Sequence, residues 1–373
     1  MKVQVLQENL QRGLSIVGRA VATRSTLPIT ANVLLQTDQG RLKLAATDLD
    51  ISISSWVGAR VEEEGATTVP SRLITDFVSS LPAAPVDLEV PERSRQMKLE
   101  CARNESTINA MDAEDFPRIA AIGEGTRIEL DAKKLRETIE KVEFAAASDE
   151  SRPVLTGVHV KSEGDKLTFA SADGFRLAVS DVKLSQPPAE PIEVIIPARA
   201  LREVSRLVGD STEPVEMRIN PQKTQVMFAL TDTELVAQLI QGTFPNYSQL
   251  IPAEWTTRCT VDVDEFKRET RIAAIFARDG SGIIRLQVDE GKLTVSAKAD
   301  EVGNNEGSID AQVEGDASKI AFNSRYLQDV LNALSGKVRL EMTSPSSQGV
   351  FRPVGDGNAD GYVHVVMPMF VQW

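Results

Sequence analysis

One motif recurs three times along this sequence, and its repetition limits how the chain can fold. "VPSRLITDFVSSLP" begins at Val69, "IIPARALREVSRLVG" at Ile195 and "AFNSRYLQDVLNALSG" at Ala321. Each copy has a small or polar start, an Arg in the first turn and apolar residues at helical spacing, which predicts a strand end that leads into a short amphipathic helix. Equivalent positions of the three copies are 127 and 126 residues apart.

Other landmarks repeat at nearly the same distance. Asp48 in "AATDLDISIS" precedes Asp173 in "ASADGFRLAVS" by 125 residues, and Phe116-Pro117 precedes Phe244-Pro245 by 128. Each third also opens with a helical pattern: "QENLQRGLSIVGRAVAT", "DAKKLRETIEKVEFAAAS" and "DVDEFKRETRIAAIFAR". A repeat far longer than a solenoid unit indicates complete domains, and a chain of 373 residues has room for three. We therefore predict three similar domains over residues 1–125, 126–253 and 254–373.

Between its two helices, each third contains short segments in which apolar and polar residues alternate. Examples are "RLKLAATDLDISISSWV", "KLTFASADGFRLAVSDVKL" and "IIRLQVDEGKLTVSAKA", with Gly, Asp or Asn at the turns. This pattern is typical of antiparallel hairpins. The predicted fold class is therefore α+β, in which each of three similar domains packs two helices on antiparallel sheet.

Charge is distributed unevenly between the predicted helices and the rest of the chain. With 41 basic and 54 acidic residues, the protein has a formal net charge of -13 and as a whole repels nucleic acid. The six predicted helical segments nevertheless carry a net charge of +7, which leaves -20 on everything else. These segments span Glu8 to Arg24, Ser71 to Leu81, Ala132 to Ala147, Ala198 to Gly209, Glu265 to Arg278 and Asn323 to Gly336.

Two explanations of the helix charge are open at this point. Helices favour Arg and Lys as well as Glu, so ordinary helix propensity accounts for part of it. The other explanation is a basic surface, built from all three domains, that contacts the phosphates of duplex DNA without reading its bases. An aromatic content of 5% argues against a platform on which single-stranded bases stack.

The sequence offers little support for an enzyme. His159 and His364 are the two histidines, and neither has a metal-ligand partner at i+2 or i+4. No G-x-G-x-x-G, P-loop or G-x-S-x-G motif occurs. Asp48 and Asp50 could hold a metal, but the repeat partner Asp173 has a Phe two places on, so turn formation explains these aspartates more simply. We expect no catalytic residue, no metal and no cofactor.

The cysteines and the hydropathy pattern indicate the cellular compartment. Cys101 and Cys259 lie in different thirds of the chain without C-x-x-C spacing, which predicts neither a disulfide framework nor a zinc site and fits a reducing cytosol. The N-terminus has no apolar signal region, and no apolar run approaches the roughly 18 residues of a membrane span. We expect a soluble cytoplasmic protein with no membrane partner.

Several stretches give the chain a specific family resemblance. They are "STLPITANVLLQ", "GATTVPSR", "RPVLTGV", "ADGFRLAV", "GTFPNY", "FNSRYLQDVLNAL" and the late "VVMPM". In this order and spacing, from Met1 to about Met369, the chain resembles the bacterial DNA polymerase III β subunits, the sliding clamps. The resemblance implies a DNA clamp fold, in which a head-to-tail homodimer closes six domains into a ring and helices line a hole around double-stranded DNA.

The resemblance also implies partners and site residues. The partners are the replicative polymerase α subunit, the clamp loader complex, and other polymerases and repair proteins that carry short clamp-binding motifs; during replication the protein would be associated with the nucleoid. The dimer contact would join Ile108 of one chain to Ile275 and Phe276 of the other, although ordinary core positions would also explain these three. The expected DNA-facing residues, each of which would otherwise be a solvated charge, are Arg24, Arg72, Arg152, Arg199, Arg202 and Arg206.

A peptide-docking pocket between the second and third domains is the family's other implied site. It would accept an extended client motif with a Gln and bulky apolar residues. The alternative explanation of "VVMPM" is a buried final strand with a Pro at its edge. The matching positions are Leu155, Ala172, Gly174, Arg176, Leu177, Pro245, Asn323, Tyr326, Ser346, Val365, Val366, Met367, Pro368 and Met369.

The chain departs from the family pattern at three places. Phe175 stands where the family often has His, which would make the pocket rim more apolar. Pro153 and Val154 replace aromatic residues of some members. The chain also continues from Phe370 to Trp373, and this tail would compete with clients if it folded into the pocket. A protein-interaction scaffold without DNA encirclement is the alternative function, and the basic helices favour the clamp over it.

Overall fold

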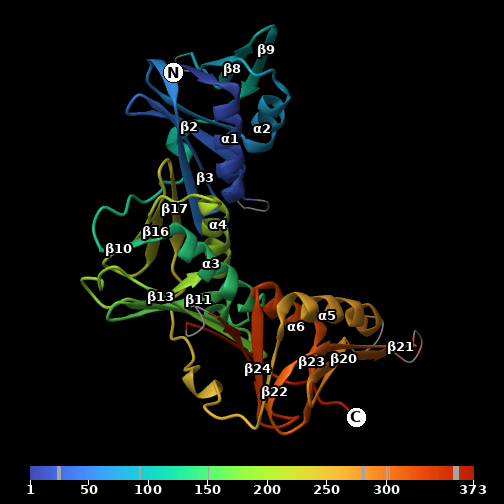
Figure 1. Cartoon of the computed structure of the whole chain (residues 1–373). Coiled ribbons are helices and arrows are strands. Elements are labelled where there is room, and N and C mark those ends of the chain that lie inside the picture. Colours follow the sequence, from blue (N-terminus) through green and yellow to red (C-terminus); the bar gives the residue numbers. More distant parts are fainter. Residues whose placement is uncertain are drawn as a thin grey trace. The chain divides into compact units, whose positions relative to one another are not determined.

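The computed structural model describes residues 1–22, 27–91, 94–149, 151–278, 282–299, 301, 303–355 and 361–373. The chain divides into two compact units. Unit 1 comprises Met1–Lys133 and Glu203–Leu239, and unit 2 comprises Lys134–Arg202 and Ile240–Trp373. Figure 1 labels all six α-helices and some of the strands.

The described residues form six α-helices, which Figure 1 labels, and six short 3₁₀ turns. The helices are α1 (Gln7–Val17), α2 (Ser71–Ser80), α3 (Ala132–Val142), α4 (Ala198–Val208), α5 (Val263–Arg278) and α6 (Ser324–Asn332). The 3₁₀ turns are η1 (Gly18–Ala20), η2 (Pro28–Ala31), η3 (Ala113–Asp115), η4 (Glu143–Ala145), η5 (Pro153–Thr156) and η6 (Ser248–Leu250).

Unit 1 contains two antiparallel sheets among its described residues. One has five strands in the order β5 (Ala59–Glu63), β1 (Lys2–Leu6), β7 (Pro85–Glu89), β8 (Gln96–Cys101) and β9 (Asn104–Asn109). The other has eight, in the order β10 (Thr126–Leu130), β15 (Val215–Ile219), β16 (Gln225–Ala229), β17 (Thr233–Gln238), β4 (Ile51–Val57), β3 (Arg41–Thr47), β2 (Asn32–Asp38) and β6 (Ala66–Pro70).

Unit 2 also contains two antiparallel sheets in its described part. The larger has nine strands in the order β14 (Glu193–Pro197), β11 (Gly157–Glu163), β12 (Lys166–Ala172), β13 (Arg176–Lys183), β26 (Tyr362–Val366), β25 (Gly349–Val354), β24 (Lys337–Met342), β18 (Thr257–Asp262) and β22 (Gln312–Gly315). The smaller has the order β21 (Gly303–Asp310), β20 (Lys292–Ala299), β19 (Ile283–Asp289) and β23 (Ser318–Asn323).

The three copies of the repeated motif fold alike, as the sequence predicted. Strands β6, β14 and β23 each end at the residue immediately before α2, α4 and α6. The predicted hairpins are the strand pairs β3-β4, β12-β13 and β19-β20. The first predicted helix is shorter than expected, because α1 ends at Val17 and one 3₁₀ turn follows from Gly18, a residue with low helix propensity.

Two sheets combine strands from different thirds of the chain. In unit 1, β17 pairs with β4, so that Leu235 lies opposite Ile53. In unit 2, β13 pairs with β26, so that Leu177 lies opposite Val365. The middle third therefore contributes strands to both large sheets. This sharing explains why the division into units passes through the middle third instead of along the predicted domain boundaries, which remain predictions.

Amphipathic helices and alternating strands form the core. On α6, Leu327, Val330 and Leu331 are buried at helical spacing. In unit 1, α1 packs on β3 and β4 at a glycine. A Cβ atom at Gly13 would lie only 2.6 Å from Leu44 Cδ1, so a larger residue there would require the Leu44 side chain to shift.

His364 lies in the middle of β26, is fully buried, and stacks on Phe144 at 5.4 Å between ring centroids. Burial lowers its pKa to about 3, and the nearby Arg176 charge acts in the same direction. Because the folded-state pKa lies below the ordinary value of 6.5, only the unfolded chain takes up this proton as the pH falls from 6.5 towards 3. This histidine therefore contributes stability that is present above pH 6.5 and is lost below it.

We expect His364→Asn to make the free energy of unfolding of unit 2 depend less on pH below 6.5. Between pH 6.5 and 4, the slope should become shallower by about 1.4 kcal/mol per pH unit relative to the unmodified chain. Urea unfolding at pH 7.5, 6.5, 5.5 and 4.5 measures both slopes. Carboxylates titrate alike in both proteins, so equal slopes would show that His364 becomes protonated in the folded state.

Candidate functional site

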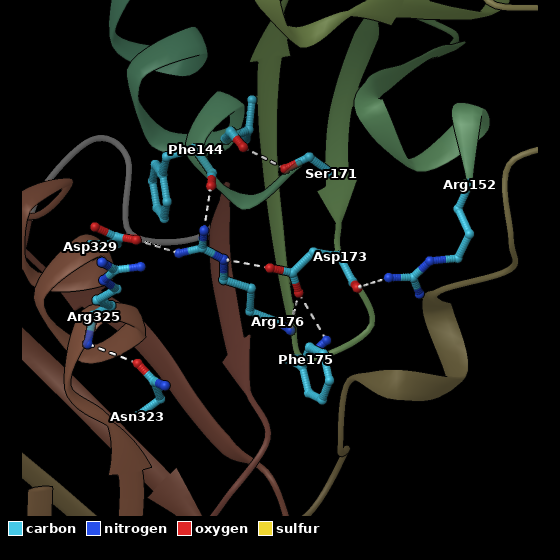
Figure 2. A network of polar contacts seen from close by, with 10 residues as sticks. Phe144, Arg152, Ser171, Asp173, Phe175, Arg176, Asn323, Arg325 and Asp329 are labelled. Carbon is cyan, nitrogen blue, oxygen red and sulfur yellow. Dashed lines mark hydrogen bonds and ion pairs between the residues drawn. The ribbon is translucent and has the colours of Figure 1, made fainter. Parts of the chain in front are cut away.

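Arg176, the first residue of β13, is the centre of a polar network in unit 2 (Figure 2). Its Nε donates to Asp173 Oδ2 at 3.0 Å, its Nη1 to Asp329 Oδ2 at 2.5 Å, and its Nη2 to the Phe144 carbonyl at 2.6 Å. The side chain is only 10% exposed. A buried guanidinium needs such partners, because an uncompensated charge would be costly to remove from water.

A tight turn positions Arg176 at the start of its strand. The Asp173 carboxylate accepts hydrogen bonds from the backbone N–H groups two and three residues later, at 2.8 and 3.0 Å. Asp48 makes the same two bonds in the first third, at 3.1 and 2.8 Å. The residue after each aspartate has positive φ, Gly174 at 95° and Leu49 at 83°. Both aspartates are therefore turn formers, as the simpler sequence interpretation held.

Two aromatic rings lie close to the Arg176 guanidinium. Its Cζ is 4.6 Å from the centre of the Tyr326 ring on α6 and 5.5 Å from that of Phe144. Phe175 stacks on Tyr326 at 6.4 Å and is 58% exposed. The Phe175 carbonyl accepts a hydrogen bond from Met367 N at 2.8 Å. The stacked rings of Phe175 and Tyr326, together with the exposed Met367 that the backbone hydrogen bond joins to Phe175, are called the rim.

Two apolar clusters lie beside this rim. Leu177 and Val365 belong to one, and Leu155 and Phe244 belong to the other. Ala172 packs against both clusters and joins them. The four named cluster residues are buried, so the exposed rim, and not the clusters, offers apolar surface to an extended peptide with bulky side chains.

The structure brings most of the predicted pocket residues together through these contacts. Asn323 caps α6 by accepting a hydrogen bond from Arg325 N at 2.9 Å, and Met369 N donates to the Ala321 carbonyl at 2.7 Å. Val366 is buried opposite Arg176, and Pro368 is half-buried. Pro245 and Ser346 are exposed, and the described contacts do not connect them to the rim.

The stretch "VVMPM" has features of both of its proposed roles, a buried final strand and part of the docking site. Val365 and Val366 complete the buried strand β26, whereas Met367 follows it and is 45% exposed. The residues after Met369 lead away from the rim. Trp373 lies over the Lys319 ammonium on β23, at 4.9 Å, and Phe370 is 86% exposed.

Sequence reasoning missed Asp329 and Phe144, which complete the Arg176 network. Phe144 contributes its backbone carbonyl, which no sequence pattern marks. Asp329 follows Tyr326 by three residues, so both lie on one face of α6. That spacing indicated that Asp329 lies beside Tyr326, but the sequence alone does not place Arg176 opposite this face of α6.

The predicted DNA-facing arginines that the structure describes are exposed. Arg24 lies outside the described residues. Arg72 lies 3.8 Å from Asp76, and Arg152 Nη2 donates to the Asp173 carbonyl at 3.0 Å. On α4, Arg199 is exposed, Arg202 pairs with Glu143 at 2.7 Å, and Arg206 pairs with Glu203 at 2.6 Å.

Acidic neighbours offset part of the helix charge. Glu203 is almost fully buried and also lies 3.5 Å from Arg19, so one carboxylate faces two arginines. Helix α5 begins at Val263 and includes Asp264, which lowers its net charge from the expected +2 to +1. Sequence reasoning also passed over Arg12 and Arg19, which line a shallow hollow on α1.

The three predicted dimer residues differ in exposure. Ile108 on β9 is only 4% exposed, which agrees with the core explanation of this residue. Ile275 on α5 is 57% exposed, and its neighbour Phe276 is half-buried. A core position therefore does not explain Ile275.

A metal-binding cluster or a membrane-spanning helix in the described part of the chain would indicate another function. Within the described ranges, no cluster of three or more His, Cys, Asp or Glu residues could hold a metal ion. In the same part of the chain, no helix is long and apolar enough to cross a membrane.

Family models of the DNA polymerase III beta subunit match the chain in three consecutive pieces. The N-terminal domain model matches residues 1–120, the central domain model residues 129–246 and the C-terminal domain model residues 248–370. The beta sliding clamp of Synechococcus elongatus is 32% identical over 99% of both chains. That of Caulobacter vibrioides is 30% identical over the full length of both.

Solved structures show the same similarity. The DNA polymerase sliding clamp of Bacillus subtilis superposes with a TM-score of 0.93 at 27% identity and covers the whole of both chains. The DNA polymerase III subunit beta of Pseudomonas aeruginosa, bound to griselimycin, has a TM-score of 0.91 at 27% identity, again over both full chains.

Proposed function

The chain belongs to the DNA polymerase III beta subunit family, the beta sliding clamps, and on that premise we propose that two copies close head to tail into a ring around duplex DNA. A sliding clamp is a processivity factor and not a catalytic enzyme. The family therefore favours the clamp over the enzyme and the scaffold that the sequence had left open.

The arrangement of strand ends is the observation that supports ring closure. The last strand of the second third, β17, pairs with β4 of the first, and the last strand of the third, β26, pairs with β13 of the second. In the first third the last strand is β9, so it is the equivalent of β17 and β26. In the third, β21 follows β23, β19 and β20 in its sheet just as β4 follows β6, β2 and β3, so it is the equivalent of β4 and β13. Among the described residues, β9 and β21 each lie at the end of a sheet and have no strand paired with their outer edge.

We propose that β9 of one copy pairs with β21 of the other. An open edge is a template for pairing with another chain. Two such junctions, related by a twofold axis, would close the ring and leave neither of these edges exposed. The same type of junction would then occur at all six places where two repeats meet.

Ile275→Asp is expected to convert the dimer into monomers. An isoleucine buried in an interface is worth about 2 kcal/mol, and the closed dimer has two such interfaces, so its dissociation constant should rise by roughly 1000-fold. Sedimentation velocity across a dilution series measures this constant. Leu250→Asp, at a similarly exposed position on η6 in unit 2, is the matched control and should leave the dimer intact. An unchanged constant for Ile275→Asp would remove α5 from the proposed interface.

We further propose that the six helices face the DNA. Their arginines and lysines would contact phosphates without reading bases, which allows sliding because no single contact depends on sequence. The negative excess on strands and loops would repel DNA from the outside of the ring.

The rim of unit 2, with the two apolar clusters beside it, is proposed to be the docking site for clients. The replicative polymerase α subunit, the clamp loader and repair proteins would each insert a short motif there. A ring linked to DNA keeps a weakly bound polymerase at high effective concentration near its template, so modest docking affinity is enough for processive synthesis. We expect the protein to act in the cytoplasm, at the replicating nucleoid.

One experiment tests ring function and docking together. The dimer is loaded onto nicked circular plasmid, and the plasmid is then linearised. A topologically linked ring should stay on the circle and slide off the linear ends, whereas a protein that merely adheres to DNA would remain on both. Binding of a Gln-Leu-x-Leu-Phe peptide to the same dimer would report the docking site independently.

A further inference from the structure

We propose that Asp329 is a positioning residue for client docking, which rests on the docking function proposed above. It holds the Arg176 guanidinium against Tyr326, and this contact fixes the shape of the rim formed by Tyr326, Phe175 and Met367. Asp329 would contribute to client affinity through these residues and would not touch the client.

The first step of the argument is the geometry of the ion pair. Asp329 Oδ2 lies 2.5 Å from Arg176 Nη1, and Figure 2 shows the carboxylate of α6 directed at the guanidinium of β13. The two residues belong to the third and second thirds of the chain. A charge-assisted hydrogen bond at this distance is among the stronger side-chain contacts. It therefore fixes α6 relative to the turn at Asp173.

The second step is that Arg176 has little capacity left for a client. Its three nitrogens all donate to groups of the chain itself, and the side chain is 10% exposed. The planar guanidinium also lies over the ring of Tyr326 and over that of Phe144. Three of the five N–H groups are thus in use and little of the guanidinium is accessible to a client, so Arg176 acts here as an internal support.

The third step connects Arg176 to the exposed rim. Tyr326 lies under the guanidinium at 4.6 Å, Phe175 stacks on Tyr326 at 6.4 Å, and the Phe175 carbonyl binds Met367 N at 2.8 Å. Each contact in this series is direct. Loss of the Asp329 charge would leave a largely buried guanidinium short of a partner, and its movement would release the Tyr326 ring.

The test compares peptide binding by full-length variants. A fluorescent Gln-Leu-x-Leu-Phe peptide is titrated with the unmodified chain, Asp329→Asn and Asp329→Glu. We expect about tenfold weaker binding for Asp329→Asn, which corresponds to about 1.4 kcal/mol, and recovery to within about threefold for the conservative Glu. The matched control is Glu216→Gln, which removes a carboxylate from the Arg127 and Arg218 ion pairs in unit 1 and should not alter the affinity.

A double-mutant cycle separates positioning from direct contact. In an Arg176→Gln background, Asp329→Asn should cause no further loss, because its effect passes through the guanidinium. A further tenfold loss in that background would mean that Asp329 touches the client, and the proposal would be wrong. Native affinity of Asp329→Asn would also overturn it.

A second readout does not need the peptide. The chain has three tyrosines, and 3-fluorotyrosine labelling gives each a ¹⁹F resonance that Tyr→Phe variants assign. Asp329→Asn should shift or broaden the Tyr326 resonance most and leave Tyr247 unchanged. If the unmodified chain does not bind the peptide, the proposed docking function fails, while this resonance still decides whether Asp329 positions Tyr326. An unchanged Tyr326 resonance would refute the positioning role.

Discussion

The combined variant Arg199→Gln, Arg202→Gln and Arg206→Gln is expected to slide off or dissociate from DNA much faster than the unmodified ring. The three side chains are exposed, and their spacing places them on one face of α4. Each lost phosphate contact lowers the slope of log affinity against log salt by about 0.9, so a ring that loses six such contacts should lose up to about 5 in slope. Equilibrium binding to a linear duplex, which a ring can leave through its ends, is measured at several salt concentrations between 50 and 200 mM and gives this slope.

Neutral substitutions make this test specific for DNA contact. Arg202 and Arg206 pair with Glu143 and Glu203, so reversal to Glu would place like charges together and disturb the helix. A control with the same charge change replaces Arg41, Arg60 and Arg127, which are exposed on strands and also pair with acidic residues. Equal losses in both variants would show that total charge, and not the helix face, holds the DNA.

The double variant Met367→Ala and Met369→Ala is expected to lose at least tenfold in affinity for the Gln-Leu-x-Leu-Phe peptide. Met367 is exposed and Met369 is half-buried, so these side chains contribute to the surface more than to the core. Methionine adapts its shape to different apolar partners, which suits a site with several clients. A fluorescence anisotropy titration measures the affinity, and the thermal unfolding midpoint should change little.

Met111→Ala is the matched control, because Met111 is a similarly exposed methionine in unit 1. It should bind the peptide normally. A chain that ends at Met369 tests the tail. Since Trp373 lies over Lys319 and not on the rim, this shortened chain should bind within about twofold of the full chain. Clearly tighter binding would mean that the tail visits the docking site in solution.

Much of the fold could be predicted because the repeat supplies three independent copies of each signal. Any one of the helices α2, α4 and α6 is short, but the same strand-to-helix transition occurs each time. Asp48 and Asp173 were recognisable as turn formers for the same reason. Helix ends were less predictable: α6 ends at Asn332 and not at Gly336, since the last turn depends on tertiary contacts.

The candidate site was predictable only in part. The family pattern identified Arg176, Tyr326 and Met367, which the structure joins in one series of contacts. It did not identify Asp329 or the Phe144 carbonyl, because their role depends on how a helix of the last third meets a strand of the middle third. The burial of Ile108 and the exposure of Ile275 were likewise undecided before the fold was known.

The sequence by itself determined the threefold repeat, the α+β class and the positive charge of the helical segments. These are local properties, set by residue type and spacing within a few dozen residues. Only the tertiary structure decided that sheets continue from one third into the next, that β9 and β21 lie at the ends of the described sheets, and that Arg176 is held by Asp329. Pairings of this kind join residues more than 100 positions apart, and their partners depend on the packing of whole elements, which no local pattern specifies.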